Sequence, residues 1–232
     1  FENLEDQVNN IIERLSSAKR PVIIAGNGIR LSGAEESFLR LVDRLKIPVL
    51  TSISGIDIIP SDSRFFFGRP GILGERCANF IIQNSDMILV LGARLGIRII
   101  GYDYASFARC AYKIMVDIDK NELYKPTLKI DMKIHADVAT FIMKMYNLID
   151  NIKLTDNTSW LLYCNNIKSK YPLVLEEHRN ISDYVSSYVF PEELSKLLTG
   201  NEIIVTGNGT AYTSTFQTIK IRKGNRMFAN EG

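Results

Sequence analysis

The chain has 232 residues and a formal net charge of +2, and 46% of its residues are hydrophobic and 23% charged. This composition is typical of a globular protein with a substantial core, and the length allows one large domain or one and a half. Because Lys and Arg are scattered among Asp and Glu, and because no apolar run approaches the roughly 18 residues of a membrane span, we expect neither nucleic acid nor a membrane as a partner.

The first 51 residues follow the pattern of a helix and then a β-α-β unit. Apolar residues recur at helical spacing over residues 4–18 and again over residues 34–45. Continuous apolar runs at 21–25 and 47–51 are typical of strands that are buried on both faces. The first of these strands leads directly into Gly-Asn-Gly at residues 26–28.

The same alternation continues to residue 150, after a polar, glycine-rich loop at residues 52–74. The pattern then predicts a helix, a fully apolar strand, two further strands and a closing helix, at residues 75–84, 87–91, 113–118, 129–134 and 137–150. Apolar strands that alternate with amphipathic helices indicate a parallel sheet covered on both faces. We therefore predict the α/β fold class, with a doubly wound, Rossmann-like central domain over residues 1–150.

A second, truncated α/β domain is expected near the C-terminus. Residues 151–187 are polar and turn-rich, with one helix around 160–170, and we interpret them as an interdomain linker. The pattern then restarts with a helix at 191–198, which carries Pro191 in its first turn, and a strand at 203–205. Residues 188–232 thus predict a domain that is cut off after about one strand and helix. Phe1 in place of an initiator Met also leads us to expect a fragment or a partly resolved longer protein.

Cysteine and histidine are too scattered to indicate a metal site. The three cysteines are odd in number, far apart and in no C-x-x-C pair, which favours a reducing compartment, and we expect a cytoplasmic location. They are Cys77, Cys110 and Cys164. His135 and His178 have no cysteine or carboxylate partner at metal-ligand spacing. We therefore expect no metal ligand and no catalytic residue in this chain.

Gly-Asn-Gly occurs twice, at 26–28 and 207–209, each time after a β-branched strand. In open parallel sheets such turns expose backbone N–H groups to phosphate ligands, although a glycine there can also serve only a tight turn. A dehydrogenase-type dinucleotide site is disfavoured at two points. Leu31 stands where G-x-G-x-x-G needs its third glycine, and the second strand ends in Thr51-Ser52 without a carboxylate.

Three further polar residues follow predicted strands. Arg94 comes just after the strand at 87–91, where a guanidinium could reach a diphosphate, and a surface salt bridge is the alternative. Asp117 or Asp119 could accept a ribose hydroxyl, and Asp119 could equally cap a helix that begins near Asn121. The residues alone predict a nucleotide-type α/β domain without a catalytic group.

Several segments together resemble the thiamine-diphosphate-dependent enzymes of the acetolactate synthase and pyruvate oxidase type. Their order and spacing match the central domain of that family in KRPVIIAGNGIRLSGA, KIPVLTSISGIDIIP, FFFGRPGILG, NSDMILVLGARLGIR, VDIDKNEL and IHADV. FPEELSKLLTGNEIIVTGNGTAY then resembles the opening of the family's C-terminal cofactor domain. The match covers most of the chain, and its specificity comes from the combination, since no single segment is specific.

The resemblance implies a slot for FAD, extended across the strand ends of the central domain. The matching positions are Gly26, Asn27, Gly28, Thr51, Ser52, Gly68, Arg69, Gly92, Ala93, Arg94, Arg98, Asp117, Ile118, Asp137 and Val138. Gly-Asn-Gly stands where flavin-binding synthases usually have three glycines, and Leu95-Gly96 where they usually have Phe-Asp. Two alternatives stay open, a slot that holds FAD and a slot without flavin, as in many relatives.

The resemblance also implies that the second turn lies beside the diphosphate of thiamine diphosphate. The matching positions are Asn208, Gly209, Thr210 and Ala211, where synthases commonly have Val-Gly-Gln-His. The family's Mg²⁺ ligands lie further along its C-terminal domain, and the glutamate that activates the cofactor lies in its N-terminal domain. We expect both to be missing from this chain.

For the parent enzyme the resemblance implies decarboxylation of a 2-oxo acid and carboligation, with thiamine diphosphate and Mg²⁺, in a homo-oligomer whose sites form between subunits. We expect this chain alone to be inactive. The alternatives are another thiamine-dependent 2-oxo acid decarboxylase or oxidase, and a non-catalytic nucleotide-binding or scaffold module. A related NAD-binding deacylase fold would need a catalytic His and usually a zinc cluster, which three scattered cysteines do not provide.

Overall fold

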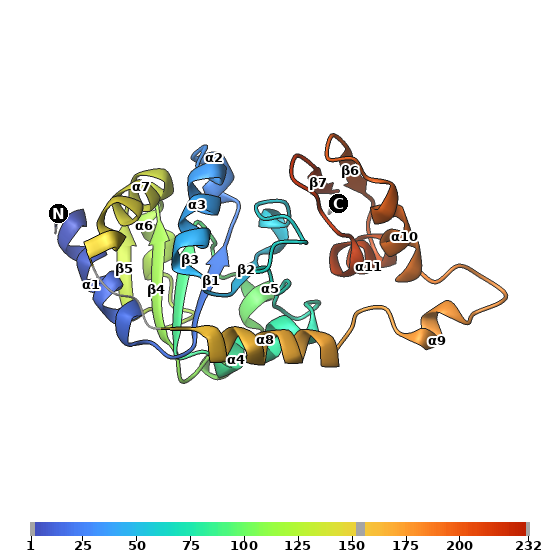
Figure 1. Cartoon of the computed structure of the whole chain (residues 1–232), viewed down its shortest axis with the longest axis horizontal. Helices are drawn as coiled ribbons and strands as arrows, with labels where there is room; N and C mark the ends of the chain where they lie inside the picture. The colour runs from blue at the N-terminus through green and yellow to red at the C-terminus, as the bar shows by residue number, and fades with distance from the viewer. Residues whose placement is uncertain (1–2, 152–155, 231–232) are drawn as a thin grey trace.

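The computed structural model describes residues 3–151 and 156–230 of the chain, and its main feature is a parallel five-stranded sheet (Figure 1). The strand order is β2-β1-β3-β4-β5, and every neighbouring pair is parallel. The strands are β1 (Pro21–Ala25), β2 (Val49–Thr51), β3 (Met87–Leu91), β4 (Tyr112–Asp117) and β5 (Met132–His135). The predicted α/β class and parallel sheet are confirmed.

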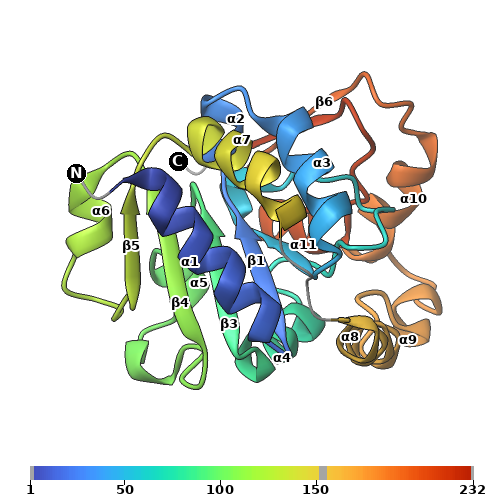
Figure 2. The same cartoon turned by 60° about the vertical axis from the view of Figure 1, so that its left-hand side comes forward.

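Helices cover both faces of this sheet, as its apolar strands require. Figure 2 shows α1 (Leu4–Ser17), α3 (Glu35–Leu45) and α7 (Val138–Leu148) across one face. Helices α4 (Arg76–Asn84) and α8 (Thr158–Lys170) cover the other. Because successive side chains of a strand point to opposite faces, β1 supplies alternate residues to two separate cores. Ile23 and Ala25 join the cluster under α1, α3 and α7, and Val22 and Ile24 join the cluster under α4 and α8.

Helix α8 belongs to these layers, although we expected it within an interdomain linker. Trp160 and Cys164 are buried in the core beneath α4, and the indole Nε1 of Trp160 donates to the carbonyl of Pro21 at 3.0 Å. The polar outer face of α8 had suggested a connection, because only these two apolar residues of the helix are fully buried. The domain boundaries at residues 150 and 187 stay a prediction, and residues 152–155 of the predicted linker lie outside the described residues.

Short helices occupy the loops that join the larger elements. They are α2 (Gly28–Leu31), η1 (Ile53–Gly55), α5 (Ile97–Ile100), η2 (Tyr104–Ser106), α6 (Lys120–Tyr124), η3 (Ile149–Asn151) and α9 (Glu176–Arg179). Asp119 caps α6, since its Oδ1 accepts from the N–H of Asn121 at 2.8 Å. That capping role was one of the two alternatives for this carboxylate.

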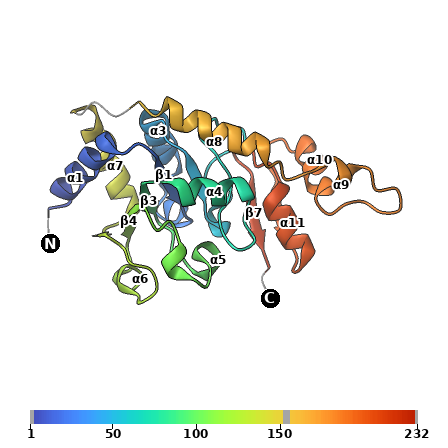
Figure 3. The same ribbon diagram turned by 90° about the horizontal axis from the view of Figure 1, so that it is seen from below.

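A second unit follows, built from α10 (Val189–Leu197), β6 (Ile203–Thr206), α11 (Thr210–Thr218) and β7 (Arg226–Ala229). Strands β6 and β7 pair in parallel, so this unit contains a complete β-α-β crossover. We had expected the chain to stop after one strand and helix, and β7 was missed because Arg226 and the glycine turn before it weaken its apolar pattern. Figure 3 shows this unit at the opposite end of the molecule from α1 and α6.

The loop after β2 joins the two units. Ile56 from this loop is buried in the core of the second unit, against residues of α11 such as Tyr212 and Phe216. Ser61 exchanges two hydrogen bonds with Ile221, one from the N–H of Ser61 at 2.8 Å and one to its Oγ at 2.9 Å. The second unit is therefore packed against the loop through both apolar and polar contacts.

Candidate functional site

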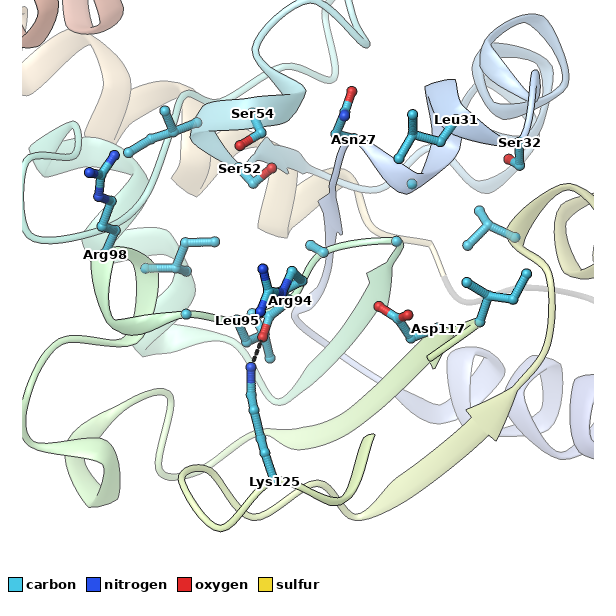
Figure 4. A pocket seen from close by; sticks show the side chains of 18 of the residues that line it. Asn27, Leu31, Ser32, Ser52, Ser54, Arg94, Leu95, Arg98, Asp117 and Lys125 are labelled. Atoms are coloured by element: carbon cyan, nitrogen blue, oxygen red, sulfur yellow. Dashed lines mark hydrogen bonds between the residues drawn. The ribbon is translucent and has the colours of Figure 1, made fainter. Parts of the chain in front are cut away.

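The carboxyl ends of β1 and β3 lie side by side where the connections of the sheet leave in opposite directions. β1 leads to β2 at one edge, and β3 leads to β4 toward the other. Open parallel sheets bind ligands at such a switch point. A pocket of about 670 Å³ lies here, and Figure 4 shows its lining residues from close by.

This pocket extends across the carboxyl ends of all five strands. Its lining includes eleven of the residues predicted for the dinucleotide slot. They are Asn27, Gly28, Ser52, Gly92, Ala93, Arg94, Arg98, Asp117, Ile118, Asp137 and Val138. Each strand end therefore contributes at least one predicted residue, because a parallel sheet gathers these ends at one edge.

The first Gly-Asn-Gly turn is locked against the loop after β3. A Cβ at Gly26 would lie 2.2 Å from the carbonyl oxygen of Gly92, and a Cβ at Gly28 would lie 2.6 Å from the Cα of Gly92. The N–H of Gly26 donates to Leu91 O, and that of Gly28 to Gly92 O, both at 2.9 Å. Of the two alternatives left open for this turn, the bonding of these two amides favours the structural one, since both are used between the two loops.

Cationic side chains gather on one side of the pocket. The guanidinium of Arg94 pairs with Glu122 at 2.6 Å, and Lys125 pairs with the same carboxylate at 2.8 Å. Lys125 Nζ also donates to the carbonyl oxygen of Arg94, the contact drawn in Figure 4. The Arg94 side chain is 79% exposed, so its charge faces solvent at the pocket mouth. The two roles considered for Arg94, contact with a diphosphate and a surface salt bridge, are therefore compatible, because Arg94 lines the pocket and also forms a salt bridge.

Carboxylates occupy the other side. Burial raises the pKa of Asp117, and the nearby charges of Glu122 and Asp119 add to this effect, whereas the N–H of Asp119, which donates to Asp117 Oδ1 at 2.9 Å, opposes it. Figure 4 shows the Asp117 carboxylate pointing into the pocket. Asp137 caps α7 by accepting from the N–H of Thr140 at 2.9 Å. Asp117 is therefore the carboxylate that can accept hydrogen bonds from a ligand hydroxyl.

Four residues predicted for the slot lie outside the pocket lining, namely Gly26, Thr51, Gly68 and Arg69. Arg69 is instead buried beside Glu75 at 3.1 Å, and burial raises the pKa of that carboxyl despite the attraction of Arg69. The Arg69 guanidinium also donates to the carbonyls of Gln217 and Ile219, both at 3.4 Å, at the end of α11. Arg69 therefore connects the two units rather than lining the pocket.

The sequence analysis missed nine lining residues, most of them on the short helices around the rim. They are Leu31, Ser32, Ile53, Ser54, Leu95, Gly96, Ile97, Ile99 and Lys125. Lys125 could not be found from spacing, because it reaches Arg94 across 31 residues. Leu31 could not be told from its neighbours by sequence either, because Ile29 on the same four-residue helix is buried in the core whereas the Leu31 side chain faces solvent. Leu31 is 82% exposed.

The second Gly-Asn-Gly turn joins β6 to α11 on the surface. Asn208, Gly209, Thr210 and Ala211 are all exposed, and no neighbouring atom lies within 4 Å of a Cβ built on Gly207 or Gly209. Gly209 is the N-cap of α11 with φ 68° and makes no side-chain cap. The first amides of this nine-residue helix therefore lie at an open turn, the arrangement that binds anions at helix N-termini.

The model of the thiamine pyrophosphate enzyme central domain matches residues 8–145, which is more than half of the chain. The chain belongs to the thiamine pyrophosphate enzyme family. Its matched residues include all five strands of the sheet and the whole pocket edge. The predicted family resemblance is confirmed.

Acetolactate synthases are among the curated relatives that the chain matches. The chain is 32% identical over 202 residues to a probable acetolactate synthase large subunit of Methanococcus aeolicus, an alignment that covers 83% of the chain and 32% of the relative. It is 31% identical over 209 residues to the acetolactate synthase large subunit of Lactococcus lactis, covering 88% of the chain and 34% of the relative. It is 29% identical over 236 residues to probable acetolactate synthase 2, chloroplastic, of Oryza sativa, covering 99% and 34%.

The chain thus spans about a third of the length of these thiamine pyrophosphate enzymes. Within residues 3–151 and 156–230, three or more His, Cys, Asp or Glu side chains nowhere gather as a metal site would require. The helices in the same parts of the chain are too short or too polar to cross a membrane.

Proposed function

We propose that this chain is the central part of an acetolactate synthase-like enzyme that acts on 2-oxo acids, and that its pocket binds the dinucleotide FAD. The observation that carries the proposal is the continuous pocket across all five strand ends, with cations on one side and a carboxylate on the other. The family membership and the acetolactate synthase relatives support the parent reaction, which is decarboxylation and carboligation.

The pocket residues fit a dinucleotide in size and in chemistry. A volume of about 670 Å³ lies within the range of cofactor sites. Arg94 and Lys125 can bind a diphosphate by charge-assisted hydrogen bonds, and Asp117 can accept from a ribose hydroxyl. Exposed apolar side chains on the rim, Leu31 at 82% and Ile118 at 68%, offer contact area for aromatic rings. A bound flavin supplies hydride-transfer chemistry.

The side chains, rather than the first glycine turn, would hold the diphosphate. The amides of Gly26 and Gly28 are already bonded to the loop after β3. Arg94 and Lys125 share Glu122, so an anion must compete with that carboxylate for them. The protein's part is therefore to hold two cations at the mouth and to keep Asp117 in place at the end of β4.

The second turn can supply backbone N–H donors to one side of a phosphate group. Its amides lie at the start of α11, and Asn208, Gly209, Thr210 and Ala211 leave the turn open. When bound, thiamine diphosphate supplies carbanion chemistry for 2-oxo acids. We propose that Mg²⁺, the remaining contacts and a partner subunit complete this site in a homo-oligomeric parent, and that the chain by itself is inactive.

Titration of the chain with FAD tests the pocket. Flavin fluorescence should report saturable binding, and Arg94→Glu should weaken it about tenfold, or roughly 1.4 kcal/mol, because the charge at the pocket mouth is reversed. Arg40→Glu is the matched control, because Arg40 is exposed on α3 away from the pocket and undergoes the same charge change. Absence of binding, or equal effects of the two substitutions, would rule out the pocket as a dinucleotide site.

A second candidate is a scaffold whose slot takes no flavin. Two observations favour it, namely the use of the Gly26 and Gly28 amides inside the protein and the pairing of Arg94 with Glu122. The same titration separates the two candidates, since a scaffold yields no flavin signal in either variant.

Calorimetric titration with thiamine diphosphate and Mg²⁺ tests the second turn. We expect no binding by this chain, because in its described parts one open turn supplies the donors and no acidic cluster could hold the metal. Micromolar affinity would show that the chain holds a complete cofactor site and would overturn this part of the proposal.

A further inference from the structure

Asp57, in the loop after β2, is bonded to both units of the molecule. Its side chain is only 3% exposed. Oδ1 accepts from Arg30 Nη2 at 3.1 Å, and Oδ2 accepts from Arg226 Nε at 2.9 Å and from the N–H of Met227 at 3.1 Å. One buried carboxylate thus binds helix α2 of the first unit and strand β7 of the second.

The partners of Asp57 lie on elements next to the two glycine turns. Arg30 is the third residue of α2, the helix that begins at Gly28 and whose Leu31 lines the pocket. Met227 pairs in register with Ile204 of β6, and the N–H of Asn230 donates to Thr206 O at 3.0 Å, just before the second turn. Asp57 therefore lies on a polar path from α2, beside the pocket, to the carboxyl end of β6. This path is separate from the direct hydrogen bond between Arg98 of the pocket and Tyr212 of α11, at 3.2 Å.

The surrounding loop supports this connection. Ser52, Ile53 and Ser54 line the pocket, whereas Ile56 packs into the core of the second unit. Figure 1 shows this loop between the sheet and the second unit. Only a few residues of chain thus separate the pocket lining from the core of the second unit.

We propose that Asp57 is a positioning residue that couples the pocket to the second Gly-Asn-Gly turn. By holding Arg30 and β7 together, it makes the placement of β6 and β7 depend on the position of α2. By linkage, docking of the second unit in turn changes the affinity of the pocket for its ligand. The response to ligand rests on the proposed function, whereas the dependence of β7 on Arg30 does not.

Hydrogen exchange of the whole chain, with and without FAD as the probe, tests the coupling. In the wild type, FAD should slow exchange at residues 27–32, and also at 203–209 and 226–229. In Asp57→Asn, an acceptor for Met227 remains but the charge that holds both arginines is gone, so protection should stay confined to 27–32. Protection at 226–229 equal to that of the wild type would overturn the proposal.

A ligand-free comparison keeps the test independent of flavin binding. Arg30→Gln should speed exchange at 226–229 about fivefold or more. It should add much less in the Asp57→Asn background, where, of its bonds to residue 57, Arg30 keeps only the one to the backbone carbonyl, at 3.0 Å. Glu35→Gln is the matched control, because Glu35 is the other ion-pair partner of Arg30, at 2.7 Å, and touches no residue of the second unit in the described contacts. Equal effects of Arg30→Gln and Glu35→Gln, or additivity with Asp57→Asn, would show that Asp57 does not couple the units.

If FAD leaves residues 27–32 unchanged in the wild type, the proposed function fails and the ligand-free comparison alone decides the role of Asp57. If Asp57→Asn does not fold, Arg30→Gln against Glu35→Gln still decides it.

Discussion

The two Gly-Asn-Gly turns have the same sequence but need their glycines for different reasons. At the first turn, Cβ atoms on Gly26 and Gly28 would collide with the backbone of Gly92, so the glycines permit two loops to touch. At the second turn a Cβ on Gly207 or Gly209 meets nothing within 4 Å, and only Gly209 has a positive φ, of 68°. The glycines of the first turn thus allow two loops to pack closely. The second turn is an open start of a helix, at which only Gly209 needs a positive φ.

The largest effect that this comparison predicts is for Gly26→Ala. A Cβ would lie 2.2 Å from Gly92 O and 2.5 Å from the Cα of Ala93, which are backbone atoms that no rotamer change can move. Overpacking of this kind should destabilise the chain by about 3 kcal/mol in urea unfolding.

The matched control for Gly26→Ala is Gly96→Ala. Gly96 lines the same pocket, has φ −72°, and leaves open space where a Cβ would lie. Gly96→Ala should change the free energy of unfolding by less than about 0.5 kcal/mol. If both substitutions cost the same, the contact between the two loops is not what requires glycine at position 26.

Periodicity was sufficient to predict the sheet and most of its helices, since continuous apolar strands such as β3 leave little choice of fold. The pocket edge was predictable for the same reason, because residues directly after parallel strands must gather there. Contacts across long stretches of sequence were not predictable. Lys125 on Arg94, Arg69 on the end of α11 and Asp57 on β7 depend on how loops fold over the sheet, and periodicity carries no information on that.

The role of the first glycine turn was also beyond the sequence. Gly-Asn-Gly is compatible with phosphate binding and with close packing of two loops. Only the position of Gly92, in a loop that starts 66 residues after Gly26, decides between them. The choice is made by the sheet order, which places β3 next to β1.

The second largest effect is expected for Gly209→Ala, and it has a backbone cause. With φ 68° and ψ −138°, this residue has a conformation that L side chains rarely adopt. The substitution should cost about 1 to 2 kcal/mol although the site is open. Thermal unfolding would measure the loss of stability, and hydrogen exchange at residues 203–218 would locate it. Unchanged exchange rates in α11 would mean that the turn adapts to the substitution without cost.

The next effect is a pH dependence of the second unit through Glu202. This carboxylate accepts from Thr199 Oγ1 at 2.7 Å, from the N–H of Thr199 at 2.9 Å, from that of Gly200 at 3.0 Å, and from Asn225 Nδ2 at 2.7 Å. The hydrogen bonds from Thr199 above all hold the pKa of Glu202 well below its usual range. The folded state therefore binds fewer protons than the unfolded chain near the ordinary pKa of a glutamate.

The contribution of Glu202 to stability is complete above that ordinary pKa and is lost as the pH falls toward the lowered folded-state pKa. Exchange at residues 203–206 and 226–229 should therefore accelerate between about pH 5 and pH 3, relative to the intrinsic rates. Glu202→Gln has no such titration, so its profile should be flatter. An identical pH profile for both proteins would contradict this assignment.

The smallest effect is expected for Gly207→Ala, and it makes the comparison sharpest. Gly207 is the counterpart of Gly26, yet it is exposed, it is outside the positive-φ region, and no atom would contact its Cβ. Alanine restricts the unfolded chain more than glycine, so the substitution should stabilise the chain slightly, by about 0.5 kcal/mol. The same Gly→Ala substitution at equivalent positions of two identical tripeptides should thus change the free energy of unfolding in opposite directions. A loss of 2 kcal/mol or more at Gly207 would mean that the second turn is packed as tightly as the first, and would remove the basis for treating it as an open phosphate-binding turn.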